Sequence, residues 1–449
     1  MVSLNVWAGS ELVGRLAHDP QANRFSFDYA APWLEFQSRF PLSPQLPLQR
    51  PPAETAEQHS AQVRQFFENL LPEGQALDHA AQAAGTTRSN LVGLLIAIGK
   101  ETAGALRVTL ADDEAAPLAS AEGADALREI TPQHLSERIR ERENQPFSVW
   151  DGKVRLSIAG YQDKIAVYER ESKWYLVDGS KLASTVIVKP LPMRKQLASL
   201  PANEHMCMQL ARRVGLDAAQ TRLVHVPEPV LLVRRFDRIE MEDGVRRLHI
   251  VDGCQALGLA VSMKYERAYG DTAEVAHLRE GASLPKLFSL VDQSPLPAVD
   301  RLGLLRWAIF QVLIGNTDAH GKNVSFFCDG RGLRLAPAYD MVCMDALDAG
   351  FSHTYAMAIG DAFSEDALSP YEWAHFGHLC KLPFRLVSHE LDGLAGQVIA
   401  VMDAFLADMI GQSVPTAVAQ RFQELVLATC ARQRQHVRQI ARFKRSDFE

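Results

Sequence analysis

The sequence lacks the features that would place it among disulfide-rich, zinc-stapled or membrane-spanning proteins. Its six cysteines form no C-x-x-C pair and have no histidine at zinc-ligand spacing. The N-terminus has no basic segment leading into an apolar one, and no run of about eighteen apolar residues occurs anywhere. We therefore expect reduced thiols, a cytoplasmic location and no membrane contact.

An excess of positive charge is also missing. The formal net charge is −7, so the chain as a whole offers no electrostatic reason for direct binding to nucleic acid. The composition, 47% hydrophobic and 22% charged, is that of an ordinary soluble protein that folds throughout. A length of 449 residues exceeds what one hydrophobic core usually serves, which predicts two or three packing units.

Several common catalytic motifs are absent as well. There is no H-E-x-x-H for a zinc peptidase and no G-x-S-x-G for a serine hydrolase. The phosphate-binding patterns G-x-G-x-x-G and G-x-x-x-x-G-K-[ST] are missing too. Any phosphate chemistry must therefore rest on other residues.

The apolar pattern divides the chain into regions of different type. Residues 1 to about 110 combine strand-like runs with two helical ones, and so predict a small α+β unit. The alanine-rich, acidic segment 111–146 is expected to be a linker, with a helix entry at Thr131 and Pro132. From 147 to 238, short strands surround one helix that Gly215 ends, and from 239 to 449 the pattern is mainly helical. A β-rich lobe therefore precedes a helical one.

One polar stretch, IGNTDAHGKN, follows a strongly apolar helical run. Asp318 and Asn323 lie five residues apart within it, which is the Asp-to-Asn spacing of the protein-kinase catalytic loop, H-R-D-x-x-x-x-N. In that loop the Asp accepts the proton of the substrate hydroxyl and the Asn binds a magnesium ion. The same letters also fit a solvated turn at a helix end, so the spacing alone leaves both interpretations open.

Residues elsewhere occur in kinase order around this stretch. Asp340 follows Asn323 by seventeen residues, after a predicted strand pair, and offers a second hard oxygen ligand for magnesium. Lys189 ends the apolar strand STVIVKP, where its ammonium could reach phosphate oxygens. Glu204, at the start of the next helix, could pair with that lysine or complement the helix dipole. We expect His320 to organise the loop rather than to act as a base.

Taken together, these motifs resemble the HipA kinases, the toxins of bacterial HipB/HipA toxin-antitoxin pairs. The resemblance extends over essentially the whole chain. It is carried in order by VWAGSELVGRL, LSPQLPLQR, FFENLLPEG, SIAGYQDK, IVKP, NEHMCMQLARRVGL, RRFDR, DGCQALG, IGNTDAHGKN and LAPAYDMV.

The resemblance implies an α+β, two-lobed protein-kinase-like fold that binds ATP and Mg²⁺. In it, 1–110 would be an additional N-terminal α+β subdomain, 111–146 a connection, 147–238 the β-rich N-lobe and 239–449 the helical C-lobe. Asp318 would be the catalytic base, Lys189 the phosphate-contacting lysine, and Asn323 and Asp340 the metal ligands. The remaining ATP-binding residues would be Ala159, Gly160, Tyr161, Gln162, Asp163, Lys164, Arg234, Arg235, Phe236, His320, Gly321, Lys322 and Tyr339.

The resemblance also implies regulation, a target and a partner. Ser157 occupies the position of a serine whose autophosphorylation switches the kinase off, because a phosphate adds enough charge to rebuild a loop. The implied target is an aminoacyl-tRNA synthetase, of the glutamyl type. The implied partner is a HipB-like antitoxin that binds DNA, so this chain would meet DNA only indirectly. One departure lies at the hinge, where many relatives have Glu and this chain has Arg234.

Two other functions are compatible with parts of this pattern. A small-molecule kinase of the aminoglycoside type shares the fold, but those enzymes place His before the catalytic Asp, whereas His320 follows Asp318. A mainly regulatory protein that holds the antitoxin on its operator is the third possibility, although the complete set of kinase residues favours activity.

Overall fold

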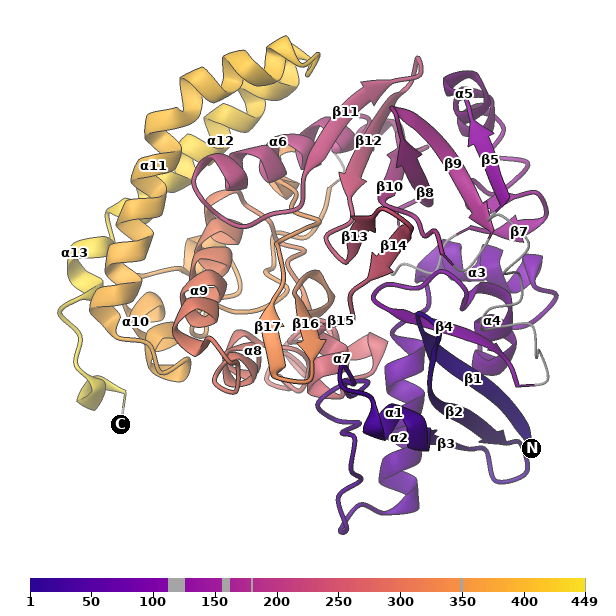
Figure 1. The fold of residues 1–449 in the computed structure, drawn as a ribbon. Helices are drawn as coiled ribbons and strands as arrows, with labels where there is room; N and C mark the ends of the chain where they lie inside the picture. Colours follow the sequence, from indigo (N-terminus) through magenta and orange to yellow (C-terminus); the bar gives the residue numbers. More distant parts are fainter. Residues whose placement is uncertain (112–125, 156–161, 179–180, 348–349, 449) are drawn as a thin grey trace. The chain divides into compact units, whose positions relative to one another are not determined.

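The computed structural model describes residues 1–111, 126–155, 162–178, 181–347 and 350–448 (Figure 1). The chain forms two compact units, which are described separately. Unit 1 comprises Met1–Pro190, Val224–Val251 and Phe327–Arg331, and unit 2 comprises Leu191–Leu223, Asp252–Phe326 and Gly332–Glu449.

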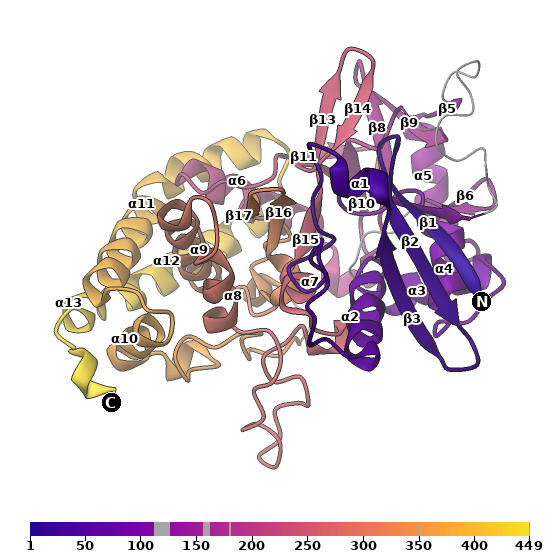
Figure 2. The ribbon, with the colours of Figure 1, turned by 60° about the horizontal axis from the view of Figure 1, so that its bottom comes forward.

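The N-terminal part of unit 1 is a four-stranded sheet with helices, as the alternating apolar residues predict. Its strand order is β3-β2-β1-β4, and every pairing is antiparallel. Helix α2 lies against β3, and α4 lies against β4 (Figures 1 and 2). The elements are β1 (Val2–Ala8), β2 (Glu11–Asp19), β3 (Arg24–Tyr29), α1 (Ala31–Glu35), α2 (Ala56–Glu68), α3 (Gly74–Ala83), α4 (Leu91–Ile98) and β4 (Leu106–Leu110).

A second, six-stranded sheet has the order β11-β12-β10-β8-β9-β5. Its buried face carries branched and aromatic side chains, among them Ile165, Trp174 and Val188, which form one apolar cluster with α5. The elements are β5 (Ala126–Ile130), α5 (Pro132–Arg140), β8 (Ile165–Arg170), β9 (Lys173–Asp178), β10 (Val186–Pro190), β11 (Thr221–His225) and β12 (Pro229–Arg234). Two hairpins accompany it: β6 (Val149–Trp150) with β7 (Lys153–Val154), and β13 (Arg238–Met241) with β14 (Gly244–Arg247).

The segment 111–146 contributes more than the expected connection. β5 pairs with β9 and forms an edge of the six-stranded sheet, and α5 begins at Pro132 as the sequence predicts. Thr131 caps this helix by accepting a hydrogen bond from the backbone of His134. Part of the acidic, alanine-rich composition therefore belongs to a strand whose partner lies almost fifty residues further along the chain.

Unit 2 is mainly helical. Helix α9 packs against α8, α11 and α12, and α11 lies along α12 (Figure 1). The helices are α6 (Leu200–Arg213), α7 (Gly253–Leu257), α8 (Leu284–Val291), α9 (Pro297–Leu313), α10 (Pro370–Leu379), α11 (Phe384–Gly411), α12 (Thr416–Arg434) and α13 (Val437–Ile440). A three-stranded sheet has the order β15 (Ile250–Asp252), β16 (Ser325–Asp329) and β17 (Gly332–Leu335), of which Ile250, Val251 and Phe327–Asp329 belong to unit 1. Short 3₁₀ turns are η1 (Lys195–Leu197), η2 (Val261–Met263), η3 (Gly321–Asn323), η4 (Met344–Ala346), η5 (Glu365–Ala367) and η6 (Arg445–Asp447).

Helix α6 differs from the predicted lobe range, which placed it with the strands of 147–238. It packs against α11 and α12 within unit 2. Asn203 bonds to the backbone of Cys343 through both ends of its amide, and the His205 ring lies 3.2 Å from the side-chain oxygen of Gln412. These partners lie more than 130 residues away along the chain, so a sequence pattern could not assign the helix to its unit.

Helix α11 is, within the described ranges, the one helix long and apolar enough to cross a membrane by length and composition. Its inward face, including Leu391, Val398 and Phe405, is buried against neighbouring helices. That packing accounts for its apolar residues as those of a core helix.

Candidate active site

The predicted catalytic loop begins where α9 ends. In the last turn of α9, the Gln311 side-chain oxygen accepts a 2.8 Å hydrogen bond from the Asn316 amide, and the Asn316 oxygen accepts one of 3.1 Å from the backbone N–H of Asp318. Gln311 and Asn316 are both buried. Between them the chain reverses at Gly315, whose φ of +65° favours glycine. The helix therefore sets the position of Asp318.

The loop then closes on Asp318. The Asp318 carbonyl accepts hydrogen bonds from the backbone N–H of His320 at 2.9 Å and from the side-chain amide of Asn323 at 3.0 Å. Because the Asn323 nitrogen is bonded in this way, its side-chain oxygen is the end suited to bind a cation. Asp318 and Asn323, joined in the sequence only by their spacing, are thus in direct contact.

Tyr339 brings Asp340 to the same loop. The Tyr339 hydroxyl donates to the Lys322 carbonyl at 2.6 Å and pairs with the Ser325 hydroxyl at 2.7 Å. Burial raises the pKa of Tyr339 far above its usual value, so the phenol remains a donor. Asp340 itself has a φ of +56°, a conformation that asparagine and aspartate tolerate better than most residues. A carboxylate and an amide oxygen are hard ligands, and this donor set fits Mg²⁺.

His320 is buried beside these groups. Burial lowers its pKa to about 3, Lys264 and Lys322 add to the shift, and Asp340 opposes it. Its Nδ1 has no hydrogen-bond partner among the residues that the structure describes. The imidazole is therefore neutral at physiological pH, which fits an organising role better than that of a base.

Lys322 has a protein partner that the sequence did not suggest. Its ammonium lies 2.6 Å from the Asp252 carboxylate, and the two side chains are 2% and 12% exposed. Asp252 also caps α7 in a reciprocal capping box with Gln255. The D-x-x-Q spacing could have revealed the cap, but nothing local pointed to the ion pair.

A second residue missed by the sequence is Tyr265, between η2 and α8. Its hydroxyl donates a 2.7 Å hydrogen bond to Oδ1 of Asp318. No short-range motif links the two, because they lie 53 residues apart. Tyr265 thus contacts the carboxylate predicted to act as the base.

Other predicted nucleotide-binding residues lie in unit 1. Lys189, in β10 opposite Leu231, and Lys164 are each 6% exposed. Burial raises the pKa of Asp163, and Arg142 opposes that shift. The Gln162 amide nitrogen is buried and has no hydrogen-bond partner in the described part of the chain. Buried cationic and donor groups of this kind suit a polyanionic ligand.

The hinge segment Arg234–Phe236 contains two arginines in different environments. Arg234 is exposed and pairs with Glu240. The Arg235 side chain is 2% exposed and binds Asp237 at 2.8 Å and Glu101 at 3.1 Å. The Arg235 side chain is therefore engaged by protein, and its backbone N–H donates to the Thr185 carbonyl at 2.9 Å. Phe236 packs edge-on against Phe327.

The structure thus groups the predicted residues in two sets. Unit 2 brings together the set Asp318, His320, Gly321, Lys322, Asn323, Tyr339 and Asp340. Unit 1 holds Gln162–Lys164, Lys189 and the hinge, whereas Glu204, 1% exposed in α6, belongs to unit 2. Ser157, Ala159, Gly160 and Tyr161 lie outside the described residues.

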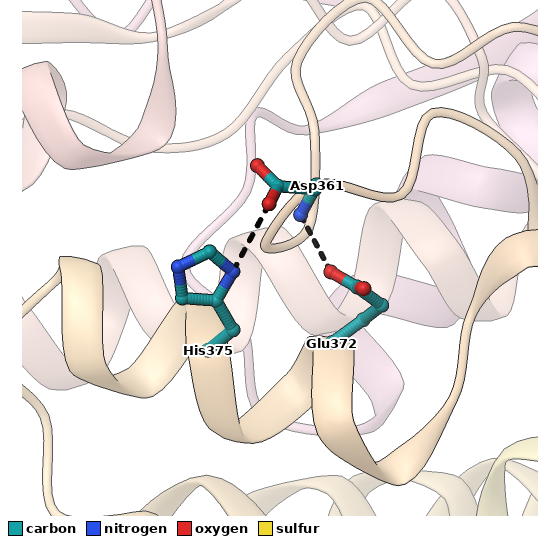
Figure 3. Close-up of side chains that lie close together, drawn as sticks. All are labelled: Asp361, Glu372 and His375. Atoms are coloured by element: carbon teal, nitrogen blue, oxygen red, sulfur yellow. Dashed lines mark hydrogen bonds and ion pairs between the residues drawn. The ribbon is translucent and has the colours of Figure 1, made fainter. Parts of the chain in front are cut away.

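A separate group with possible metal ligands occurs at the start of α10 (Figure 3). The ligand atoms of Asp361, Glu372 and His375 lie within 4.8 Å of one another. However, Glu372 accepts the backbone N–H of Asp361 at 2.6 Å, and the Asp361 carboxylate pairs with both His375 and Arg279. These contacts show that the three side chains hold the 360–363 turn against the start of α10, and they account for the group without a metal ion.

Comparison with known proteins agrees with this geometry. Residues 4–109 match the HipA N-terminal domain, and residues 156–405 match the HipA-like C-terminal domain. The serine/threonine-protein kinase toxin HipA of Shewanella oneidensis is 36% identical over 400 residues, which cover 88% of each chain. The solved complex of HipA, HipB and operator DNA from the same organism contains a chain with a TM-score of 0.84 and 34% identity, covering 98% of this chain and 100% of that one.

This similarity confirms the expected α+β, kinase-like fold. Two family domains and a relative matched over most of both lengths leave no other assignment, and the chain belongs to the HipA family.

Proposed function

We propose that this chain is an ATP-dependent serine/threonine protein kinase that acts as the growth-inhibiting toxin of a toxin-antitoxin pair. The observation that carries the proposal is the closed loop in which Asn323 bonds to the Asp318 carbonyl while Tyr339 ties the Asp340 segment to the Lys322 carbonyl. This arrangement supports the proposal, because phosphoryl transfer requires the proposed base and the two proposed oxygen ligands to lie in one small region.

In the proposed reaction, Asp318 accepts the proton of a serine or threonine hydroxyl as the oxygen attacks the γ-phosphate. Asn323 and Asp340 would hold magnesium, and Lys189 with Gln162–Lys164 would contact the phosphates. Bound Mg²⁺ and ATP supply the transferable phosphoryl group and neutralise its charge. The protein's contribution is position and electrostatic stabilisation rather than a covalent intermediate.

The proposed substrate is an aminoacyl-tRNA synthetase, of the glutamyl type, and the proposed self-modification site is Ser157. Support for both comes from the family resemblance over the SIAGYQDK and IGNTDAHGKN segments. Phosphoproteomics after brief induction of the wild type and of Asp318→Ala would report substrate and self-modification together. A synthetase or Ser157 phosphorylated equally in both strains would remove that part of the proposal.

The proposed partner is a HipB-like antitoxin, through which the protein would meet operator DNA. The Shewanella relative was solved together with HipB and operator DNA. A gel-shift assay with the neighbouring antitoxin, with and without this protein, tests whether the toxin strengthens operator binding. We also propose a cytoplasmic location, because the solved complex of the Shewanella relative contains operator DNA.

The decisive test of activity is Asp318→Ala, with Asp366→Ala as the matched control because Asp366 is an exposed aspartate outside the loop. We expect Asp318→Ala to abolish transfer of radiolabelled phosphate from ATP and to relieve growth arrest, while Asp366→Ala behaves as the wild type. Retained toxicity and label transfer in Asp318→Ala would refute the kinase assignment.

A further inference from the structure

The hydroxyl of Tyr265 donates a 2.7 Å hydrogen bond to Oδ1 of the Asp318 carboxylate. A hydrogen bond from a neutral donor to an ionised carboxylate is charge-assisted and strongly directional. The bond therefore selects one orientation of the carboxylate among those that its side-chain torsions allow.

The backbone on either side of Tyr265 is fixed to the catalytic loop. The Lys264 carbonyl accepts a 2.9 Å hydrogen bond from the N–H of Gly321. Gly321 has no room for a side chain, since an added Cβ would lie 2.4 Å from Cβ of Ala282. Gly321 is therefore packed tightly against Ala282, and its N–H joins the loop to the Lys264 backbone.

The next residue along the chain is held as well. The Glu266 N–H donates to the Ala356 carbonyl at 2.9 Å, and the Ala356 N–H donates to the Thr317 carbonyl at 2.9 Å. The Glu266 carboxylate is buried and pairs with Arg279 at 2.6 Å. The segment of Tyr265 is therefore linked on one side of Asp318 to Thr317, through Ala356, and on the other side to Gly321.

The ring of Tyr265 is confined too. It meets the His320 ring edge-on with 5.2 Å between centroids, and the Lys264 ammonium lies 5.3 Å from its centre. Both contacts use the ring and not the hydroxyl. Replacement of tyrosine by phenylalanine should therefore remove the hydrogen bond while it keeps the packing.

We propose that Tyr265 is a positioning residue for phosphoryl transfer, which holds the Asp318 carboxylate in the orientation that receives the proton of the substrate hydroxyl. This inference rests on the proposed function of Asp318. Because a small misplacement of a reacting group can cost a large factor in rate, loss of the hydroxyl should act on turnover rather than on nucleotide binding.

The test is Tyr265→Phe in the full-length chain, compared with Tyr269→Phe. Tyr269 lies four residues further on and is 58% exposed, so it controls for loss of a phenol in the same segment. The initial rate of radiolabelled phosphate incorporation into the chain is measured against ATP concentration at fixed Mg²⁺. Binding of a fluorescent ATP analogue and thermal unfolding are followed on the same samples.

We expect the maximal rate of Tyr265→Phe to fall roughly tenfold or more, with half-saturating ATP, analogue affinity and melting temperature close to the wild-type values. Tyr269→Phe should match the wild type throughout. An unchanged maximal rate in Tyr265→Phe would overturn the inference. A raised rate would overturn it as well, because it would mean that the phenol competes with the substrate hydroxyl for Asp318.

If the affinity for the ATP analogue and the melting temperature fall together with the rate, Tyr265 has a merely structural role. Asp318→Ala, assayed in parallel, separates the two hypotheses. If Asp318→Ala is inactive and Tyr265→Phe is not impaired, only the inference fails. If Asp318→Ala still transfers phosphate, the proposed function itself fails.

Discussion

At the scale of single residues, Asp340 is constrained both by its proposed chemistry and by its backbone conformation. Asp340 combines a predicted ligand role with a left-handed backbone at φ +56°. An alanine there would lose the carboxylate and also strain the backbone, by about 1 kcal/mol. The two effects must be separated before any loss of activity is interpreted.

Asp340→Asn separates them, because asparagine tolerates this conformation about as well as aspartate. We expect its thermal unfolding to resemble that of the wild type, whereas phosphate transfer should fall at least a hundredfold, about the loss that removal of one stabilising group causes in other enzymes. Asp340→Ala should be equally inactive but less stable. Substantial activity in Asp340→Asn would exclude the charged carboxylate as a required ligand.

The Lys322–Asp252 pair gives a prediction about stability at the same scale. Asp252→Asn keeps a side-chain acceptor for the cap of α7 but removes the negative charge opposite a buried ammonium. We expect the free energy of unfolding to fall by roughly 2–3 kcal/mol, measured by urea titration. Asp271→Asn, at an exposed pair with Arg267, should change it by less than about 1 kcal/mol. If Asp252→Asn and Asp271→Asn lowered the free energy of unfolding equally, burial would not explain the strength of the Lys322–Asp252 pair.

At the scale of elements, the segment after α4 is joined to the hinge of unit 1 by charged side chains, of which Glu101 is partly exposed and Arg235 and Arg238 are buried. Glu101 lies 3.0 to 3.3 Å from Arg247, Arg235 and Arg238. Asp237 accepts from the backbone N–H of Gly104 at 2.8 Å. The N-terminal sheet region and the β12–β13 connection are therefore linked by ion pairs, and not by apolar contacts alone.

Acid should weaken this link in a defined pH range. Burial opposes ionisation of Glu101, but Arg247, Arg238 and Arg235 outweigh it and lower its pKa from 4.5 to about 2. Because the folded-state pKa lies below the unfolded one, the stabilisation is complete above pH 4.5 and is lost as the pH falls towards 2. Glu101→Gln should lower stability at pH 7 by roughly 3 kcal/mol and flatten the acid dependence.

The measurement is the melting temperature of wild type and Glu101→Gln between pH 7 and pH 3. Glu129→Gln, whose carboxylate is exposed and pairs with Lys173, is the control. If the difference in melting temperature between wild type and Glu101→Gln is the same at pH 7 and pH 3, protonation of Glu101 does not cause the loss of stability in acid.

At the scale of the whole molecule, the residues predicted to bind Mg²⁺ and ATP occur in both units. Lys189 belongs to unit 1 and Asp340 to unit 2. If the proposed function holds, bound ligand should stabilise the folded chain against unfolding. Binding to the folded state adds about 2.7 kcal/mol at a ligand concentration one hundred times the dissociation constant.

We therefore expect Mg²⁺ with ATP to raise the melting temperature of the wild type, and removal of Mg²⁺ by a chelator to reduce that shift. Lys189→Ala and Asp340→Asn should each diminish the shift, and Lys153→Ala, at an exposed lysine of unit 1, should not. A full shift in Lys189→Ala would argue that this lysine contacts no phosphate.

The sequence by itself determined most local elements and the candidate catalytic loop. Apolar periodicity located strands such as β1, β8 and β10 and helices such as α9 and α11, since such patterns act over a few neighbouring residues. The five-residue spacing of Asp318 and Asn323 left two interpretations open, and Lys189, Asp340 and the family resemblance made the loop the candidate.

Only the tertiary structure decided what surrounds that loop. Tyr265 and Asp252 reach Asp318 and Lys322 across 53 and 70 residues, α6 joins the helical unit, and β5 joins a sheet from a segment expected to be a connection. These relations depend on which distant surfaces pack together. That choice is made by burial and hydrogen bonding summed over the whole fold, and no local pattern encodes it.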